Sequence, residues 1–364
     1  MWSKGILILL SIFLLEQSGF SQDSSKFVHS FSFRTGYGFI TTHNTTMLYF
    51  TNQHMPKLEL TYEKINTRNK AWENEYQHAN FGMGISNFIF QNEIIGNATA
   101  LYPFLYFKLL GKNKLQWKFR TAIGMGYITK PFNEKSNYKN SAIGSPINLY
   151  FSFLTELNYQ ISQRLSINTA IDFSHFSNSS FRKPNLGINI PSINLGLRYH
   201  VGKKQEIPIP NKPIVEDTKI HIELAGAYSF HEIYPIGGKT YHTKNLSLNL
   251  VKRVNFKSSF IASVDYFHNP AIHDELARDS IYVNKGWGST QIGIGIGHYL
   301  HLGRFSMGNH IGFYLKNENV FLRPYYNGFS GNYELNKNMK FFICLKTHLA
   351  KAEYLLIGFK YQLK

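Results

Sequence analysis

Cysteine is almost absent from the sequence, and several protein classes are excluded with it. The single cysteine, Cys344, cannot form an internal disulfide framework or a cysteine-based zinc site, and no cysteine follows the N-terminal leader as in a bacterial lipoprotein. Acidic residues are also scarce: 22 Asp and Glu stand against 39 Lys and Arg, for a net charge of +17. The mean hydropathy of −0.24 excludes a multi-helix membrane protein. After the leader no apolar run reaches the about 20 residues that a spanning helix needs, so a membrane location would require a closed β-barrel.

Apolar and aromatic residues, by contrast, are abundant. They make up 43% and 16% of the chain, and a chain with so many aromatic and β-branched residues does not stay disordered. With 364 residues the chain is long enough for one large domain or two ordinary ones.

Residues 1–21 are predicted to be a secretory signal peptide. Lys4 supplies the positive charge, residues 6–15 form an apolar segment, and Gly19 and Ser21 are the small residues of a cleavage site. The apolar segment is too short to anchor the chain in a bilayer. We therefore expect export from the bacterial cytoplasm.

Long segments of the sequence alternate between apolar and polar or small residues. The odd positions of residues 147–160 are mostly large and apolar, whereas the even positions include Ser152, Glu156 and Asn158. Residues 117–127 and 355–363 follow the same pattern. Because side chains on a strand point alternately to opposite faces, each segment is a β-strand with one apolar face.

The strands fit a transmembrane barrel better than a soluble β-sandwich. They are longer than the usual five or six residues and suit a tilted crossing of a bilayer. Glycines 293, 295 and 297 alternate on the face that would line a narrow barrel. Aromatic residues near strand ends resemble the girdles of outer-membrane barrels: Tyr102, Phe104, Tyr106, Phe107, Tyr159, Tyr199 and Phe230. The predicted fold class is all-β, an antiparallel transmembrane β-barrel.

The strands fall into two halves around a Pro-rich linker at residues 202–217. Eight strands are predicted in residues 29–201, enough for the smallest closed barrel with a filled interior: 29–40, 55–65, 80–91, 97–109, 115–128, 146–161, 164–177 and 190–201. Residues 218–364 hold seven or eight more: 219–230, 240–252, 256–267, 287–299, 303–316, 338–349, 352–364 and a shorter one near 320–325. Two tandem barrels or one merged barrel would accommodate these strands, and the linker favours two.

One strand ends with a residue pair suited to hydrolysis. His175 and Ser177 are two residues apart and therefore share a strand face. A base beside a hydroxyl is what a serine nucleophile needs. The shared face is the apolar one, so in a barrel this polar pair would point into lipid, where it has no evident structural value.

The parity of the next strand places Asn189 on the same face. Its side-chain oxygen can hold the second imidazole nitrogen of His175 and fix the ring orientation. Backbone N–H groups after Ser177, or the side chain of Asn178, are candidates for stabilising an oxyanion.

These residues resemble a known family. The motif is His-x-Ser-Asn at 175–178, Pro-Asn-x-Gly at 184–187, and a polar residue twelve positions after the serine. It is similar to that of the lipid A 3-O-deacylase (PagL-like) or acyloxyacyl hydrolase family of eight-stranded outer-membrane barrels. The resemblance covers about residues 29–201, and residues 218–364 have no counterpart in the family's small barrel.

The resemblance implies a Ser-His-Glu type of triad that removes an ester-linked acyl chain from lipid A without a cofactor. Ser177 would be the nucleophile, His175 the base, and Asn178 and Asn185 the asparagines near the oxyanion. The departure is Asn189, which stands where the family has Glu and cannot offset an imidazolium charge.

The connections on either side of this strand suggest where its end lies. A tight turn at 162–164 precedes it and a long loop follows, and in outer-membrane barrels the long loops face outside. His175 and Ser177 would then lie near the outer leaflet, where lipopolysaccharide resides. Arg182 and Lys183 in the loop are candidates to contact lipid A phosphates or are simply solvated loop charges.

Other chemistries find little support in the sequence. His298 and His301 cannot share a strand face, so no metal site is expected, and scattered basic residues do not suggest nucleic-acid binding. Glu59 and Glu63 are predicted to face the barrel interior and to pair with Lys118, Arg120 or similar charges. The oligomeric state stays open.

The leading hypothesis is thus an outer-membrane esterase that deacylates lipid A. A non-catalytic barrel, whether structural protein, adhesin or pore, is the alternative, and a phospholipase is a third option because the same chemistry serves glycerophospholipid esters.

Overall fold

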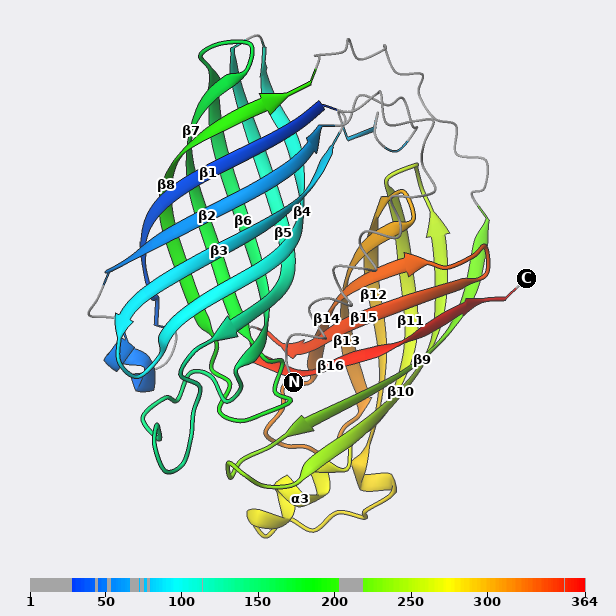
Figure 1. Cartoon of the computed structure of the whole chain (residues 1–364). Coiled ribbons are helices and arrows are strands. Elements are labelled where there is room, and N and C mark those ends of the chain that lie inside the picture. Colours follow the sequence, from blue (N-terminus) through cyan, green and yellow to red (C-terminus); the bar gives the residue numbers. More distant parts are fainter. Residues whose placement is uncertain are drawn as a thin grey trace, which may run out of the picture.

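The structure of the chain is a computed structural model that describes residues 28–42, 45–50, 54–65, 72, 75–76, 79–112, 114–202, 219–349 and 351–363 (Figure 1). The predicted leader at 1–21 and nearly all of the predicted linker lie outside the described residues.

Two closed antiparallel barrels of eight strands each make up the structure, so the prediction of tandem barrels is confirmed. The first barrel comprises β1 (Val28–Phe39), β2 (His54–Ile65), β3 (Asn80–Asn92), β4 (Gly96–Lys112), β5 (Leu115–Ile128), β6 (Ile147–Gln160), β7 (Leu165–Ser177) and β8 (Ile188–Val201). The second comprises β9 (Ile220–Glu232), β10 (Thr240–Arg253), β11 (Ser258–His268), β12 (Thr290–Leu302), β13 (Phe305–Lys316), β14 (Tyr325–Glu334), β15 (Met339–His348) and β16 (Lys351–Gln362). Each barrel closes through its first and last strands, β1 with β8 and β9 with β16.

The alternation in the sequence is the alternation between lumen and exterior. On β7 and β8 the outward Ile171 and Ile193 are 62% and 65% exposed, whereas the inward Asp172 and Ser174 are buried. Apolar residues therefore coat the outside of the barrel, as a lipid-facing surface requires. No helix among the described residues is both long and apolar enough to cross a membrane.

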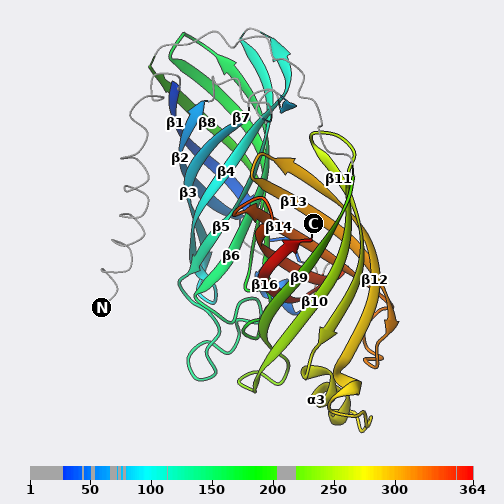
Figure 2. The ribbon, with the colours of Figure 1, turned by 90° about the vertical axis from the view of Figure 1, so that its right-hand side faces the viewer.

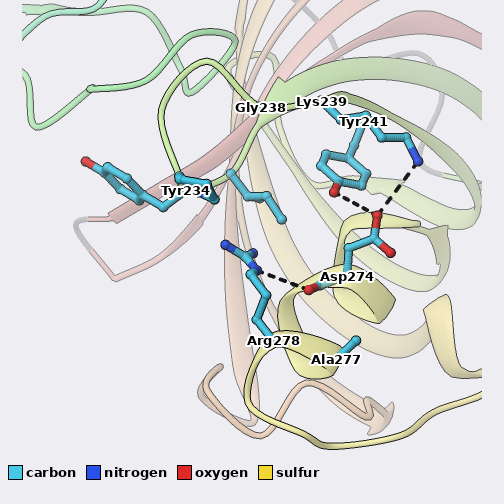
Figure 3. A pocket seen from close by; sticks show the side chains of 9 residues that line it. Tyr234, Gly238, Lys239, Tyr241, Asp274, Ala277 and Arg278 are labelled. Atoms are coloured by element: carbon cyan, nitrogen blue, oxygen red, sulfur yellow. Dashed lines mark hydrogen bonds and ion pairs between the residues drawn. The ribbon is translucent and has the colours of Figure 1, made fainter. Parts of the chain in front are cut away.

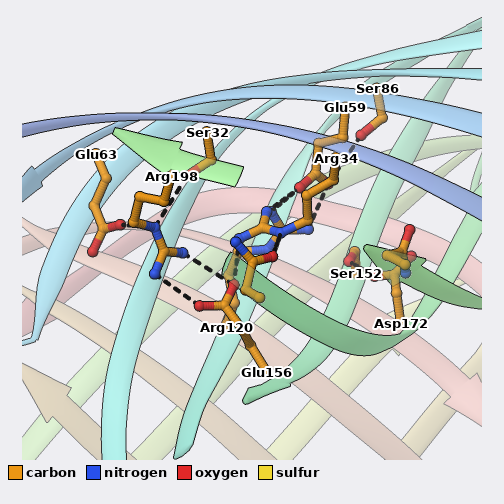
Figure 4. Close-up of polar contacts among 12 residues, drawn as sticks. Ser32, Arg34, Glu59, Glu63, Ser86, Arg120, Ser152, Glu156, Asp172 and Arg198 are labelled. Carbon is orange, nitrogen blue, oxygen red and sulfur yellow. Dashed lines mark hydrogen bonds and ion pairs between the residues drawn. The ribbon is translucent and has the colours of Figure 1, made fainter. Parts of the chain in front are cut away.

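The lumen of the first barrel is filled by charged side chains that cross-link its strands (Figure 4). Arg120 donates to both carboxylate oxygens of Glu59, each at 2.8 Å, as the sequence predicts. Arg34 pairs with Glu59 and also with Glu156, so one guanidinium joins carboxylates from two strands. Arg198 is 2.8 Å from Glu156. Because all of these groups are buried, each charge depends on its partners for stability.

Part of the aromatic assignment was wrong. Tyr102, Phe104 and Tyr106 point into the lumen and are at most 2% exposed, whereas Tyr159 and Tyr199 face outward as predicted. The inward rings fill space left by glycine on β3, where a Cβ on Gly84 would lie 2.5 Å from the ring of Tyr102. These rings are therefore core residues of the barrel and do not form a girdle.

The short strand predicted near 320–325 was also misplaced. The strand is β14, which begins at Tyr325. Its inward and outward faces carry many small or polar residues, among them Gly328, Ser330 and Gly331, so the apolar alternation is weak. The outer face carries the aromatic residues Tyr325, Phe329 and Tyr333, of which Phe329 and Tyr333 are 50% and 46% exposed.

The two ends of the barrels differ. The end that we call the loop end carries the 3-10 helix η2 (Thr45–Phe50), the β5–β6 and β7–β8 loops, and the helix α3 (Ala271–Arg278) with the 3-10 helix η3 (Trp287–Ser289) between β11 and β12 (Figures 1 and 2). The opposite end, the turn end, has tight turns such as the one before β7, where the N–H of Ile161 donates to the carbonyl of Leu165. The barrels contact each other at both ends: at the turn end Lys257 lies 3.4 Å from Glu75. No strand of one barrel pairs with a strand of the other within the described ranges.

Candidate active site

His175 and Asn189 meet at the loop end of the first barrel. They are direct cross-strand partners on β7 and β8, so their side chains leave the sheet on the same outer face. Nδ1 of His175 lies 2.5 Å from Oδ1 of Asn189. An amide oxygen only accepts hydrogen bonds, so Nδ1 carries the proton and Nε2 is left as the basic nitrogen.

Two further residues confine the imidazole of His175. The ring of Phe151 on β6 stacks on it at 4.7 Å between centroids with an interplanar angle of 27°. On another side lies the backbone of Gly187, where a Cβ would be 2.8 Å from Cε1 of His175. Gly187 also has a φ of +79°, which side chains rarely tolerate. The ring is thus held by a stack, a hydrogen bond and a close backbone contact.

Ser177 is the last residue of β7 and lies on the same outer face as His175. Both residues are half-buried, whereas the outward residues nearer the middle of the strand are exposed. In the described structure no hydrogen bond joins the Ser177 hydroxyl to the His175 ring. Catalytic hydrogen bonds often tighten only when substrate binds, so the pair is a base and a hydroxyl at neighbouring positions of one face.

Asn178 and Asn185 hold the β7–β8 loop. The buried amide of Asn178 donates to Oγ of Ser145 at 3.0 Å and to the carbonyl of Arg182 at 2.8 Å. Its backbone N–H donates to Oδ1 of Asn185 at 2.9 Å. The structure therefore shows a scaffolding role for both asparagines, and their part in stabilising an oxyanion stays a prediction.

The residues after Asn178 have an unusual backbone. Ser179 and Ser180 have φ values of 53° and 65°, in a region that few residues other than glycine adopt. Consecutive residues of this kind turn their N–H groups to a common side, and such strain clusters at functional sites. Oγ of Ser179 is buried without a hydrogen-bond partner among the described residues.

The two basic residues of the loop differ in their surroundings. Arg182 is exposed, whereas Lys183 is half-buried. Nζ of Lys183 donates to Oγ of Ser180 at 3.1 Å and lies 5.5 Å from the ring centroid of Tyr234, in the second barrel. Burial, with Lys351 close by, lowers the pKa of Lys183 to about 8.

Asp172 cannot complete a triad, as its parity predicts. It points into the lumen, where it is 2.5 Å from Nζ of Lys57 and accepts a hydrogen bond from Ser152. Among the described residues no group of His, Cys, Asp and Glu is arranged to hold a metal ion.

The second barrel carries a cavity of about 360 Å³ at its loop end (Figure 3). Tyr241 donates to the Asp274 carboxylate at 2.8 Å, and Lys239 lies 3.7 Å from the same group. Arg278 donates to the main-chain oxygen of Asp274. The cavity contains neither His175 nor Ser177, and its acid is occupied by its own neighbours, so we do not assign the reaction to it.

Comparison with known proteins supports the family resemblance that the sequence indicates. Residues 56–198 match the family described as lipid A 3-O-deacylase (PagL), and residues 218–364 match the C-terminal domain of acyloxyacyl hydrolase. None of the curated proteins matches the chain.

Among solved structures, the crystal structure of the outer-membrane enzyme PagL is 13% identical, with a TM-score of 0.29, and the match covers 46% of this chain and 97% of that one. Neisserial surface protein A is 8% identical, with a TM-score of 0.32 over 48% of this chain and 97% of that one. A Rhodopseudomonas blastica porin is 7% identical, with a TM-score of 0.17 over 93% and 100%. Likenesses this low add nothing to the family match. Each of the two barrels thus matches a family model of its own, the first that of lipid A 3-O-deacylase (PagL) and the second that of the acyloxyacyl hydrolase C-terminal domain, and together the two matches span most of the chain.

Proposed function

We propose that the protein is exported by its leader to the outer membrane and there removes an ester-linked acyl chain from lipid A with Ser177, His175 and Asn189. The observation that carries the proposal is the 2.5 Å contact between His175 and Asn189 on the outer face of the barrel. A buried structural histidine would point inward, and an outward histidine that is held on three sides and flanked by a serine has the arrangement of a general base.

In the reaction, Nε2 of His175 takes the proton of the Ser177 hydroxyl as Oγ attacks the ester carbonyl. The tetrahedral intermediate collapses when His175 returns the proton to the sugar oxygen, which leaves as an alcohol. Water then attacks the acyl-serine with the same base, the fatty acid leaves, and Ser177 regains its proton. Asn189 keeps Nδ1 protonated throughout and so preserves the basic nitrogen.

The intermediate needs donors at its oxyanion. The N–H groups of Ser179 and Ser180 are our candidates, because both residues follow the nucleophile closely and have positive φ values. The amide of Asn178 is occupied by Ser145 and Arg182, so it would have to leave these partners to take part.

The position of Ser177, His175 and Asn189, which we call the trio, suits a lipid substrate. Outward residues of β7 and β8 are apolar and exposed, and the trio lies where these strands meet the loop end. An acyl chain can therefore lie along the barrel wall while the sugar stays among the loops, where Arg182 and Lys183 can contact phosphate.

Mass spectrometry of lipid A from cells that express the protein tests the proposal. The wild type should release one acyl chain, and Ser177→Ala should leave lipid A intact. Ser136→Ala, at an exposed serine of the β5–β6 loop, is the matched control and should behave as wild type. Unchanged lipid A in wild-type cells would favour a non-catalytic barrel, and loss of acyl chains from glycerophospholipid alone would favour a phospholipase.

A further inference from the structure

The β7–β8 loop, residues 178–187, is held by both barrels. Glu232, the last residue of β9 in the second barrel, forms two hydrogen bonds with this loop. The backbone N–H of Glu232 donates to the carbonyl of Ser180 at 2.9 Å, and Oε2 of Glu232 accepts the backbone N–H of Lys183 at 2.9 Å. One residue of the second barrel thus fixes both ends of the segment 180–183.

Further contacts between the loop and the second barrel add to these hydrogen bonds. Oγ of Ser180 donates to the carbonyl of Ala352 on β16 at 3.2 Å. The rings of Phe181 and Phe230, from the loop and from β9, lie 6.3 Å apart between centroids. The loop therefore contacts both strands that close the second barrel.

The first barrel holds the opposite side of the loop. Ser145, in the β5–β6 loop, accepts the amide of Asn178, and a Cβ on Gly144 would lie 2.5 Å from the carbonyl oxygen of Lys183. The loop is therefore enclosed between the β5–β6 loop on one side and β9 and β16 on the other.

Such enclosure matters because the loop begins in an unfavourable conformation. The positive φ values of Ser179 and Ser180 persist only where surrounding contacts impose them. Ser180 is also the residue that the second barrel binds through both its carbonyl and its hydroxyl. Glu232 and Ala352 thus both contact Ser180, one of the two residues with positive φ, three positions from Ser177.

We propose that the second barrel is a positioning element of the active site and that Glu232 is its main positioning residue. By fixing Ser180 and Lys183, Glu232 sets the place of the N–H groups after Ser177 and the direction of its hydroxyl. This inference rests on the proposed function of the His175 site. Glu232 itself touches no reacting atom.

Steady-state kinetics of the full-length protein on purified lipopolysaccharide in detergent micelles test the inference. Glu232→Ala removes the carboxylate acceptor and should lower kcat about tenfold, the loss of one hydrogen bond to a charged acceptor, while KM stays within about twofold. Glu232→Gln keeps an acceptor oxygen and should recover most of kcat. Glu318→Ala is the matched control and should leave both constants unchanged, because among the described residues Glu318 pairs with Lys316 of its own barrel.

Hydrogen exchange supplies a readout that does not depend on activity. The amide of Lys183 should exchange faster in Glu232→Ala than in wild type, with no change in the strands of either barrel, whereas a misfolded variant would exchange faster throughout. If Glu232→Ala misfolds, Ser180→Ala, which removes only the bond to Ala352 and the contact of the Lys183 amine, should still lower kcat about threefold. If the wild type is active and Glu232→Ala is equally active, the inference is overturned. If the wild type has no activity, the proposed function is overturned, and hydrogen exchange at the Lys183 amide still shows whether Glu232 fixes the loop.

Discussion

The two barrels share a strand number and an alternation but fill their interiors differently. In the first, Arg34, Glu59, Arg120 and Glu156 form a continuous buried ion network. In the second, the lumen near the loop end is built around Tyr326, whose hydroxyl donates to Asp265 at 2.5 Å. These ion pairs connect several strands across the lumen. The barrel that carries His175, Ser177 and Asn189 is therefore also the more heavily cross-linked one.

The outer faces differ in a similar way. Each barrel has an outward histidine stacked on an aromatic ring: His175 on Phe151 at 4.7 Å, and His242 on Tyr228 at 5.6 Å. His242 has Thr240 and Lys244 as its neighbours on the same face and bonds to the hydroxyl of Tyr228. A histidine on a lipid-facing strand is therefore not enough; the serine two residues away and the asparagine across the strand are what distinguish the first barrel.

Replacing these two histidines should give the largest contrast. His175→Ala removes the base, and lipid A deacylation should fall by about 10³-fold or more. His242→Ala removes an outward ring that no step of the reaction uses, and activity should stay within about twofold. Rates of fatty-acid release from micellar lipopolysaccharide would measure both, and a comparable loss in the two variants would contradict the assignment of the reaction to the first barrel.

The two interiors should differ in their contribution to stability. Arg120→Met leaves Glu59 buried with fewer partners and should lower the free energy of unfolding by about 3 kcal/mol. Lys346→Met, in the second barrel, removes the 2.7 Å contact with Glu353. Glu353 still has His348 as a neighbour at 3.5 Å, so the free energy of unfolding should fall by about half as much as in Arg120→Met. Urea unfolding in detergent micelles, followed by tryptophan fluorescence, would compare them. Equal losses would mean that the ion network of the first barrel is not its main stabilising feature.

Much of this contrast could be predicted from the sequence because parity on a strand is local. The outward placement of His175 and Ser177 and the inward placement of Glu59 follow from counting by two, and both are confirmed; the prediction that Glu59 pairs with Lys118, Arg120 or a similar charge is met by Arg120. The stacking of Phe151 on His175 could also have been predicted from the sequence. The tight turn at 161–164 fixes the register of β6 and β7, and that register sets the two residues opposite each other.

Other features depend on contacts that no local pattern encodes. The register of β7 and β8 is set by the folded loop between them, so parity gave the face of Asn189 but not its direct pairing with His175. The lumen position of Tyr102 depends on a glycine of the neighbouring strand. The hydrogen bond from the Lys183 N–H to Glu232 depends on how the two barrels pack against each other, and no pattern in the sequence indicates that packing.

The close backbone contact around His175 gives a smaller effect than removal of the ring. Gly187→Ala should push the imidazole away from Asn189 and strain the backbone, and we expect kcat to fall about 30-fold. Gly226→Ala, on the outer face of β9, meets its nearest atom at 3.8 Å and should be tolerated within about twofold. A fully active Gly187→Ala would show that the ring position is not critical.

The asparagine of the trio offers a change in the opposite direction. Asn189→Asp supplies the negative charge that offsets the imidazolium, and kcat should rise about tenfold at pH 7. Unfolding in urea should be little affected, since the side chain keeps its shape and lies half-buried on the outer face. If kcat falls, then His175 does not become charged in the rate-limiting step.

Lys183 lies where the two barrels meet and should give the smallest effect. Burial lowers the pKa of its amine to about 8, so the amine is cationic below that pH and loses its charge above it. The lipid A phosphates stay anionic over this range, so their attraction to Lys183 weakens as the pH rises. KM of the wild type should therefore rise about threefold between pH 7 and pH 9, in keeping with a single charge contact at a half-buried loop residue. Lys183→Arg keeps its charge at both pH values and should show a flat KM; the same rise in this variant would place the titrating group elsewhere.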